Sequence, residues 1–287
     1  MTISSSATAE DLAVGPLPDS LRTQWHLSKF YTKGIVAGGL PIISSDKPSD
    51  YALKEARFLI DRMLEGRDDL RQAIVKQHVR MAVMAYSEMT TMIPEHSDLQ
   101  PTKYWDKRAR GLGATHARPA VSCAEENLLE YPGDPYVHEN ILIHEFAHVI
   151  HEIALAEVDP TFDGRLRKAF DQAQSEGLWK GTYAGTNHKE YWAEAVQCWF
   201  QCGRTDPPQH NHVRTRAQLQ EYDPRVAKLI AEVFRNGDWI YTAPSQRSEA
   251  GHLTGFDRAK APRFAWPAGL VEWNKKYEEE QREKQKK

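Results

Sequence analysis

The chain has few cysteines, no excess of positive charge and no long apolar run. Its three cysteines in 287 residues, Cys123, Cys198 and Cys202, are too few for a disulfide framework. We therefore expect buried free thiols, with a bridge from Cys123 to one of the other two as the alternative. The formal net charge of −3 argues against a nucleic-acid partner, which needs a basic surface. Because no run of eighteen apolar residues occurs, no membrane-spanning segment is predicted.

The most informative stretch is the pentapeptide His-Glu-Phe-Ala-His at 144–148, inside a largely apolar run from Ile141 to Leu155. Residues four apart lie on one face of an α-helix, so His144 and His148 can both reach a single metal ion. Glu145 then stands beside a water molecule on that ion, as in the HExxH motif of zinc hydrolases. The alternative is a pair of ordinary core histidines, but burying both with a glutamate and no metal would be costly.

A catalytic zinc ion has three protein ligands and one open position, so a third ligand is required. His151 follows His148 by three residues, and we expect it to hydrogen-bond locally or to meet solvent instead. Ala154 stands where a metzincin has its third histidine, and this excludes that type. Gly181-Thr182 matches the start of an aspzincin pattern, but Ala184 replaces the required aspartate.

The third ligand is predicted from a second pair of residues four apart, Glu190 and Glu194. On a helix they share a face, with Glu190 as the ligand and Glu194 accepting a hydrogen bond from a metal-bound imidazole. Two alternatives stay open, Glu194 as the ligand and a solvated acidic face. The Trp- and Phe-rich surroundings argue against the solvated face, because the segment looks buried.

HEFAH at 144–148, followed by EYWAEA at 190–195, resembles the catalytic domain of anthrax lethal factor-type gluzincins. Residues 118–143 also resemble related fungal conidiation-specific secreted proteins. The resemblance implies an α+β, zincin-like metallopeptidase fold, mostly helical with a small mixed sheet, and one Zn²⁺ per chain. In that family a tyrosine seven residues before the glutamate ligand stabilises the oxyanion, and Tyr183 has this spacing. His188 and Tyr191 are the alternatives for that role.

We expect three regions: a mobile tail at 1–20, a zincin-like catalytic domain at 21–245, and a C-terminal extension at 246–287 that ends in a charged helix. The first fifteen residues lack the basic and apolar regions of a signal peptide. This favours a cytoplasmic protein, whereas the resemblance to the fungal proteins favours secretion.

The hydrophobic periodicity of the sequence predicts the remaining helices and strands with less precise bounds. Helices are expected at 49–65, 160–176 and 223–234, and a strand within 79–85. Loops are expected at 104–113 and 177–186, the second carrying Tyr183 towards the metal. Residues 114–123 are expected to form either an edge strand that pairs with an extended peptide or an ordinary surface strand.

The predicted activity is hydrolysis of peptide bonds, with Glu145 as the general base and zinc as the cofactor. The expected partner is a peptide or small amide substrate. One alternative is a zinc hydrolase acting on a non-peptide amide or ester. The other is a non-catalytic binding protein, which the presence of Glu145 disfavours.

Overall fold

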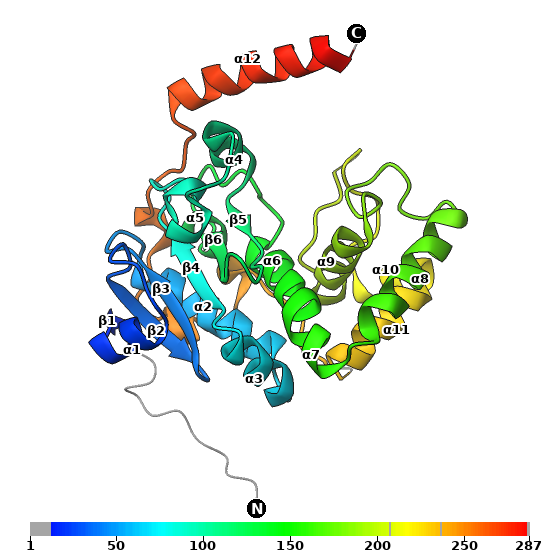
Figure 1. Cartoon of the computed structure of the whole chain (residues 1–287), viewed down its shortest axis with the longest axis horizontal. Coiled ribbons are helices and arrows are strands. Elements are labelled where there is room, and N and C mark those ends of the chain that lie inside the picture. The colour runs from blue at the N-terminus through cyan, green and yellow to red at the C-terminus, as the bar shows by residue number, and fades with distance from the viewer. Residues whose placement is uncertain (1–12, 207, 236, 286–287) are drawn as a thin grey trace, which may run out of the picture.

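The computed structural model describes residues 13–206, 208–235 and 237–285. In this part of the chain a six-stranded sheet comes mainly from the N-terminal half, and the helices after it form a second layer (Figure 1). The strands are β1 (Gly15–Pro16), β2 (Lys33–Ala37), β3 (Leu40–Ser44), β4 (Arg80–Met84), β5 (Gly111–Leu112) and β6 (Ala120–Ala124). The helices include α1 (Asp19–Gln24), α2 (Asp50–Met63), α3 (Asp68–Lys76), α4 (Thr102–Arg108), α5 (Glu125–Leu128) and α6 (Ile141–Val149).

The chain then continues through a π-helix, η4 (Ile150–Leu155), and the short α7 (Ala156–Val158). The later helices are α8 (Phe162–Ser175), α9 (His188–Phe200), α10 (Arg216–Tyr222), α11 (Pro224–Val233) and α12 (Ala268–Gln285). Short 3₁₀ turns are η2 (Thr90–Met92), η3 (Pro94–His96), η5 (Pro244–Gln246), η6 (Gly251–Leu253) and η7 (Arg258–Lys260). The expected α+β class with a small mixed sheet is therefore confirmed. No helix of the described residues is both long and apolar enough to cross a membrane.

The strand order is β1-β2-β3-β4-β6-β5. The pairs β3–β4 and β4–β6 are parallel, and the other neighbouring pairs are antiparallel. Every residue of β3, β4 and β6 is buried. Such strands read as continuous apolar runs because both faces are covered, and this explains the imperfect alternation in 79–85.

Both faces of the sheet are packed. Helices α2 and α6 lie on one face and contribute to the large core cluster. A smaller cluster covers the opposite face; it contains Leu17, Tyr31, Ile43, Ala82, Met84, Ile93 and Ala124. Helix α9 packs on α6, and α8, α10 and α11 pack around α9. Helix α6 therefore lies between the sheet and the second helical layer (Figure 1).

The predicted helices at 49–65, 160–176 and 223–234 are confirmed as α2, α8 and α11. Ser49 caps α2 by accepting a hydrogen bond from the backbone of Tyr51, and Pro224 occupies the first turn of α11. Residues 104–113 differ from the predicted loop, because they hold most of α4 and all of β5. The strand expected within 114–123 is β6, but it is central, and β5 is the edge strand.

The predicted boundaries also shift. Gly15–Pro16 pairs with β2 and α1 begins at Asp19, so the last part of the predicted tail belongs to the fold; residues 1–12 lie outside the described residues. Much of the predicted extension packs back on the core. The buried carboxylate of Glu55 in α2 contacts the side chains of Arg247 and His252, each at 2.6 Å. The charged run lies beyond this contact, in α12 (Figure 1).

Candidate metal centre

Asn140 is the N-cap residue of helix α6, which begins at Ile141. The Asn140 side chain accepts a hydrogen bond from the backbone N–H of Ile143, which satisfies one of the donors exposed at a helix start. The helix is buried along nearly its whole length because its apolar residues face both the sheet and α9. His144 and His148 are 5% and 8% exposed. The local sequence therefore brings two imidazoles into the interior on one face of the helix.

Helix α9 begins at a second asparagine cap, Asn187, whose side chain accepts hydrogen bonds from the backbone of Lys189 and Glu190. This cap fixes the first helical turn, which carries Glu190. The two helices are joined by the indole N–H of Trp192, which donates to the Ala147 carbonyl at 2.8 Å. The cap and this interhelical bond together set the position of Glu190 relative to the α6 histidines.

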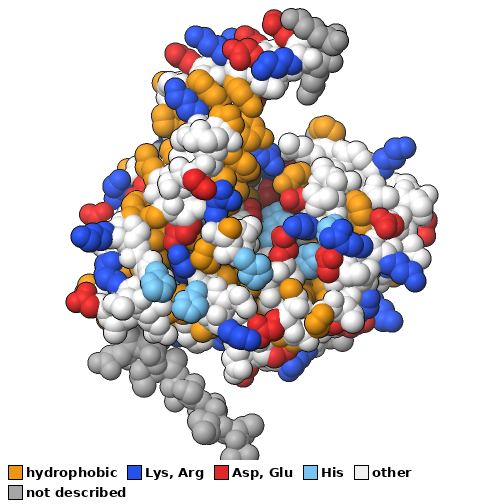
Figure 2. All heavy atoms as spheres, viewed as in Figure 1, with side chains coloured by type: hydrophobic (Ala, Val, Ile, Leu, Met, Phe, Trp, Pro, Cys, Tyr) orange, Lys and Arg blue, Asp and Glu red, His pale blue; other side chains and the backbone are white. Residues whose placement is uncertain are grey.

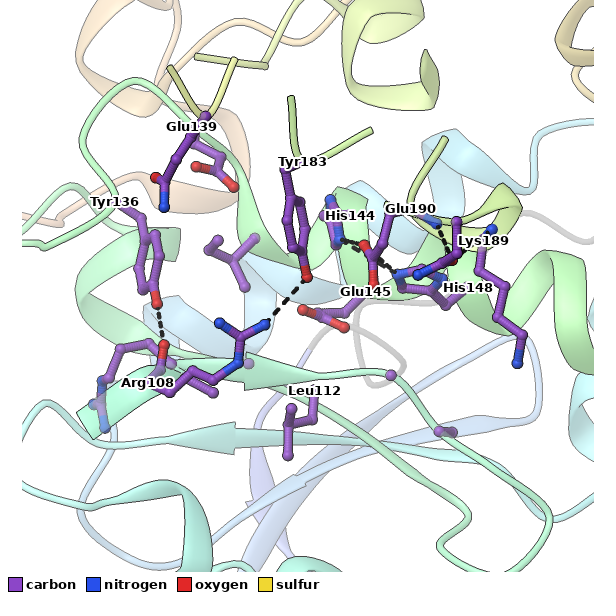
Figure 3. A pocket seen from close by; sticks show the side chains of 18 of the residues that line it. Arg108, Leu112, Tyr136, Glu139, His144, Glu145, His148, Tyr183, Lys189 and Glu190 are labelled. Carbon is purple, nitrogen blue, oxygen red and sulfur yellow. Dashed lines mark hydrogen bonds and ion pairs between the residues drawn. The ribbon is translucent and has the colours of Figure 1, made fainter. Parts of the chain in front are cut away.

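Three donor atoms from these helices converge on one point (Figure 3). One oxygen of Glu190 lies 3.1 Å from His144 Nε2 and 3.4 Å from His148 Nε2. The two Nε2 atoms are 3.3 Å apart. Tetrahedral zinc with bonds of about 2.0–2.1 Å holds neighbouring ligand atoms about 3.3 Å apart. The three side chains thus already have the spacing, and the nitrogen and oxygen donors, that a zinc ion requires.

The orientation of His144 is set from behind by Gln197. His144 Nδ1 donates to the Gln197 side-chain oxygen at 3.0 Å, while the Gln197 amide donates to the Asn140 carbonyl at 3.1 Å. In its neutral form, with the proton on Nδ1, the imidazole presents a free lone pair at Nε2 to a metal. The predicted acceptor, Glu194, lies farther from His144 Nδ1, at 3.5 Å. Its other oxygen accepts instead from His210 Nδ1 at 2.9 Å.

The surrounding carboxylates give the centre a negative electrostatic potential. Burial lowers the pKa of His144, but hydrogen bonding to Glu190 and the charges of Glu145 and Glu194 outweigh burial and raise it to about 10. Burial raises the pKa of Glu190, yet its hydrogen bonds to the two histidines hold it well below the usual range. A cation between these groups would compensate their charge, as metal sites commonly do.

Glu145 faces the same space from the side of the sheet edge (Figure 3). Burial raises its pKa, and hydrogen bonding from the Gly113 backbone opposes that rise. A Cβ at Gly113 would lie 3.2 Å from the Cβ of His148 and 3.5 Å from Glu145 Oε2. A Cβ at Gly111 would lie only 2.4 Å from an Ile141 methyl group. Both glycines therefore let the edge strand and the segment after it approach α6 closely.

A cleft of about 460 Å³ opens over the three donors and Glu145. Gly111, Leu112 and Gly113 line one side of it, and Asn187, Lys189 and Glu190 line another. Figure 2 shows the hollow at the middle of this face, with histidine and acidic side chains inside it. Since β5 is the last strand of the sheet, the cleft runs along an edge that has no further strand among the described residues.

The side chain of Tyr183 lies over the candidate metal centre. Its ring stacks on His144 with the centroids 6.1 Å apart, and its hydroxyl accepts from Arg108 Nη2 at 3.5 Å. Burial and the charge of Glu190 raise the pKa of Tyr183, so the hydroxyl stays protonated and can donate. The two alternatives lie elsewhere: His188 contacts Asp163 at 3.1 Å, and the Tyr191 hydroxyl donates to buried Asp223 at 2.6 Å.

The structure brings together His144, Glu145, His148, Tyr183 and Glu190, as the sequence analysis expected. The hydrogen bond from His144 Nδ1 was expected to go to Glu194, but in the structure Gln197 accepts it. Gln197 could have been found, because it lies seven residues after Glu190 and thus on the same helix face. The local sequence around Arg108 and around His210 contains no pattern that would have predicted a place in this site.

The three cysteines are buried and free, which confirms the predicted thiols and excludes the bridge from Cys123. Cys198 donates to the Val213 carbonyl at 3.2 Å. Burial raises the pKa of all three thiols. They therefore stay protonated at neutral pH and do not belong to the centre.

No protein-family model matches the chain, and no curated protein matches it. Among solved structures, the PRO-PRO endopeptidase PPEP-2 of Paenibacillus alvei is similar, with a TM-score of 0.39 and 15% sequence identity. The likeness covers 68% of this chain and 97% of that one. The lethal factor-type family stays an expectation from the sequence.

Proposed function

We propose that the protein is a zinc-dependent hydrolase, most simply a metallopeptidase of the gluzincin type with a zincin-like fold. The observation that carries the proposal is the convergence of His144, His148 and Glu190 at 3.1–3.4 Å beside Glu145. Two imidazoles and one carboxylate leave a tetrahedral ion one open position, which is the mark of a catalytic rather than a structural zinc site.

A zinc ion bound there would supply Lewis acidity and make a water molecule nucleophilic at neutral pH. The remaining chemistry belongs to the side chains. Glu145 accepts the proton of the attacking water and passes it to the leaving amine. Tyr183 donates its hydroxyl to the developing oxyanion, while Arg108 holds that hydroxyl over the cleft.

The edge strand favours a peptide over a small molecule. β5 pairs with β6 on one side only among the described strands, and Gly111 and Leu112 line the cleft. An extended peptide can add to such an edge through backbone hydrogen bonds, with its carbonyl placed over the metal. A small amide would leave this strand edge unpaired.

The proposal is tested by comparing zinc-loaded wild-type protein with Glu145→Gln on a peptide library and on a panel of small amides and esters. We expect cleavage of internal peptide bonds that is lost in the variant. Turnover of only the small amides or esters would favour the non-peptide hydrolase. Equal turnover by the variant would refute Glu145 as the base. Zinc binding with no turnover of either set would indicate a non-catalytic binding protein.

A further inference from the structure

A second group of metal-binding side chains lies next to the candidate centre. It consists of His151 of η4, Asp163 of α8 and His188, the first residue of α9. Their donor atoms lie within 4.8 Å of one another. His151 follows His148 by three residues and His188 precedes Glu190 by two. The two chain segments that build the first centre therefore also contribute to this second group.

The contacts of Asp163 resemble those of Glu190 in the first centre. Asp163 Oδ1 lies 3.0 Å from His151 Nε2 and 3.1 Å from His188 Nε2. In the first centre, one oxygen of Glu190 faces two Nε2 atoms in the same manner. Neighbouring ligands of a first-row metal ion lie about 3.0 Å apart in octahedral geometry and about 3.3 Å apart in tetrahedral geometry. The two distances from Asp163 match these spacings, and the two imidazoles have donor atoms within 4.8 Å of each other.

The side chains are held in place by their surroundings. The side chains of His151 and His188 are 2% and 12% exposed. The His151 ring meets Phe162 edge-on, with centroids 5.8 Å apart, and Trp192 at 6.2 Å. The second oxygen of Asp163 accepts from Arg167 at 2.7 Å, which leaves Oδ1 directed at the imidazoles. A carboxylate fixed in this way by a neighbouring donor is typical of a metal ligand.

We propose that His151, Asp163 and His188 form a second site for a divalent first-row transition metal ion, separate from the catalytic site. The side chain of Asp163 is 47% exposed, so solvent would complete the coordination. The ion would join η4, α8 and the start of α9, and so stabilise the segment that carries Glu190. Arg167 reduces the negative charge at the site, and we therefore expect weaker binding than at the first centre.

The test is the number of zinc equivalents bound by the full chain after equilibrium dialysis, measured by atomic spectroscopy. We expect two equivalents for the wild type and one for Asp163→Ala. Asp171→Ala, an exposed aspartate on the same helix, is the matched control and should keep two. His148→Ala should lose the other equivalent. Chelator should remove the Asp163-dependent equivalent first.

A second measurement separates a metal site from a hydrogen-bonded cluster. In a His148→Ala background, zinc should raise the thermal midpoint, because an ion that binds the native state stabilises it. His188→Gln keeps a hydrogen-bond donor for Asp163 but removes an imidazole, so the zinc-dependent rise should be lost. An unchanged rise, or two equivalents in Asp163→Ala, would overturn the second site. One equivalent lost in His148→Ala but none in Asp163→Ala would overturn it while leaving the catalytic centre standing.

Discussion

The hydrogen bond from His144 to Gln197 offers a sharp test of how the centre is built. Gln197 is 1% exposed and its oxygen lies 3.0 Å from His144 Nδ1. Gln197→Leu keeps similar bulk but removes the acceptor that holds the proton on Nδ1. Loss of such a partner behind a metal-binding histidine weakens metal affinity about 10- to 100-fold, or about 1.4–2.7 kcal/mol.

The structure indicates where in this range the loss of zinc affinity should fall. Glu194 Oε1 is buried without a hydrogen-bond partner and lies 3.5 Å from His144 Nδ1, so a small movement lets it replace Gln197. We therefore expect the single variant near the tenfold end. Gln197→Leu combined with Glu194→Ala should lie near the hundredfold end, because no acceptor then remains.

Zinc affinity is measured by competition with a chromogenic chelator, in an Asp163→Ala background that leaves one site. Gln197→Glu is the control that keeps an acceptor at Nδ1 while losing the bond to the Asn140 carbonyl, and its affinity should fall less than that of Gln197→Leu. Circular dichroism verifies that each variant is folded. Unchanged affinity in the double variant would refute the idea that His144 binds the metal through Nε2 with its tautomer fixed from behind.

Three further predictions concern single side chains. Glu145→Gln should keep zinc at wild-type affinity while turnover falls below detection, whereas Glu190→Ala should lose zinc itself; metal content and peptide cleavage, measured together, separate a base from a ligand, and the reverse pattern would contradict both roles. Tyr183→Phe should lower kcat about 100-fold with little change in KM, since one oxyanion donor stabilises the transition state by about 3 kcal/mol; a change confined to KM would contradict the role. His96 is 1% exposed and burial lowers its pKa from 6.5 to about 4, so its contribution to stability is complete above pH 6.5 and is lost as pH falls towards 4, by up to about 3 kcal/mol. Urea unfolding of the metal-free protein at pH 7 and pH 4.5 should show a smaller acid loss in His96→Gln than in the wild type, and equal losses would contradict the assignment.

The three side chains proposed to bind the metal could be identified because helical spacing groups His144 with His148, and Glu190 with Glu194. His144 and His148 are four apart, and Glu190 lies in the first turn of a helix whose start is marked by Asn187. The same reasoning extended two turns beyond Glu190 would have reached Gln197, but the acceptor behind His144 depends on how α9 packs on α6. Such packing is not encoded in the spacing of one helix.

The sheet edge shows where the sequence pattern fails. The strand β6 has the apolar character of a buried strand, but no local signal indicates whether a further strand lies beside it. That neighbour, β5, is only Gly111–Leu112, too short to produce an alternating pattern. It fits against α6 because Gly111 has no Cβ to meet Ile141. The edge of the cleft is thus determined by a close tertiary approach and not by strand propensity.

The most direct test of the account is anomalous diffraction at the zinc edge from crystals of the zinc-loaded protein. We expect a peak about 2.0–2.1 Å from His144 Nε2, His148 Nε2 and a Glu190 oxygen. A map with no peak between these three atoms, or with Glu190 turned away from both imidazoles, would contradict the proposed centre.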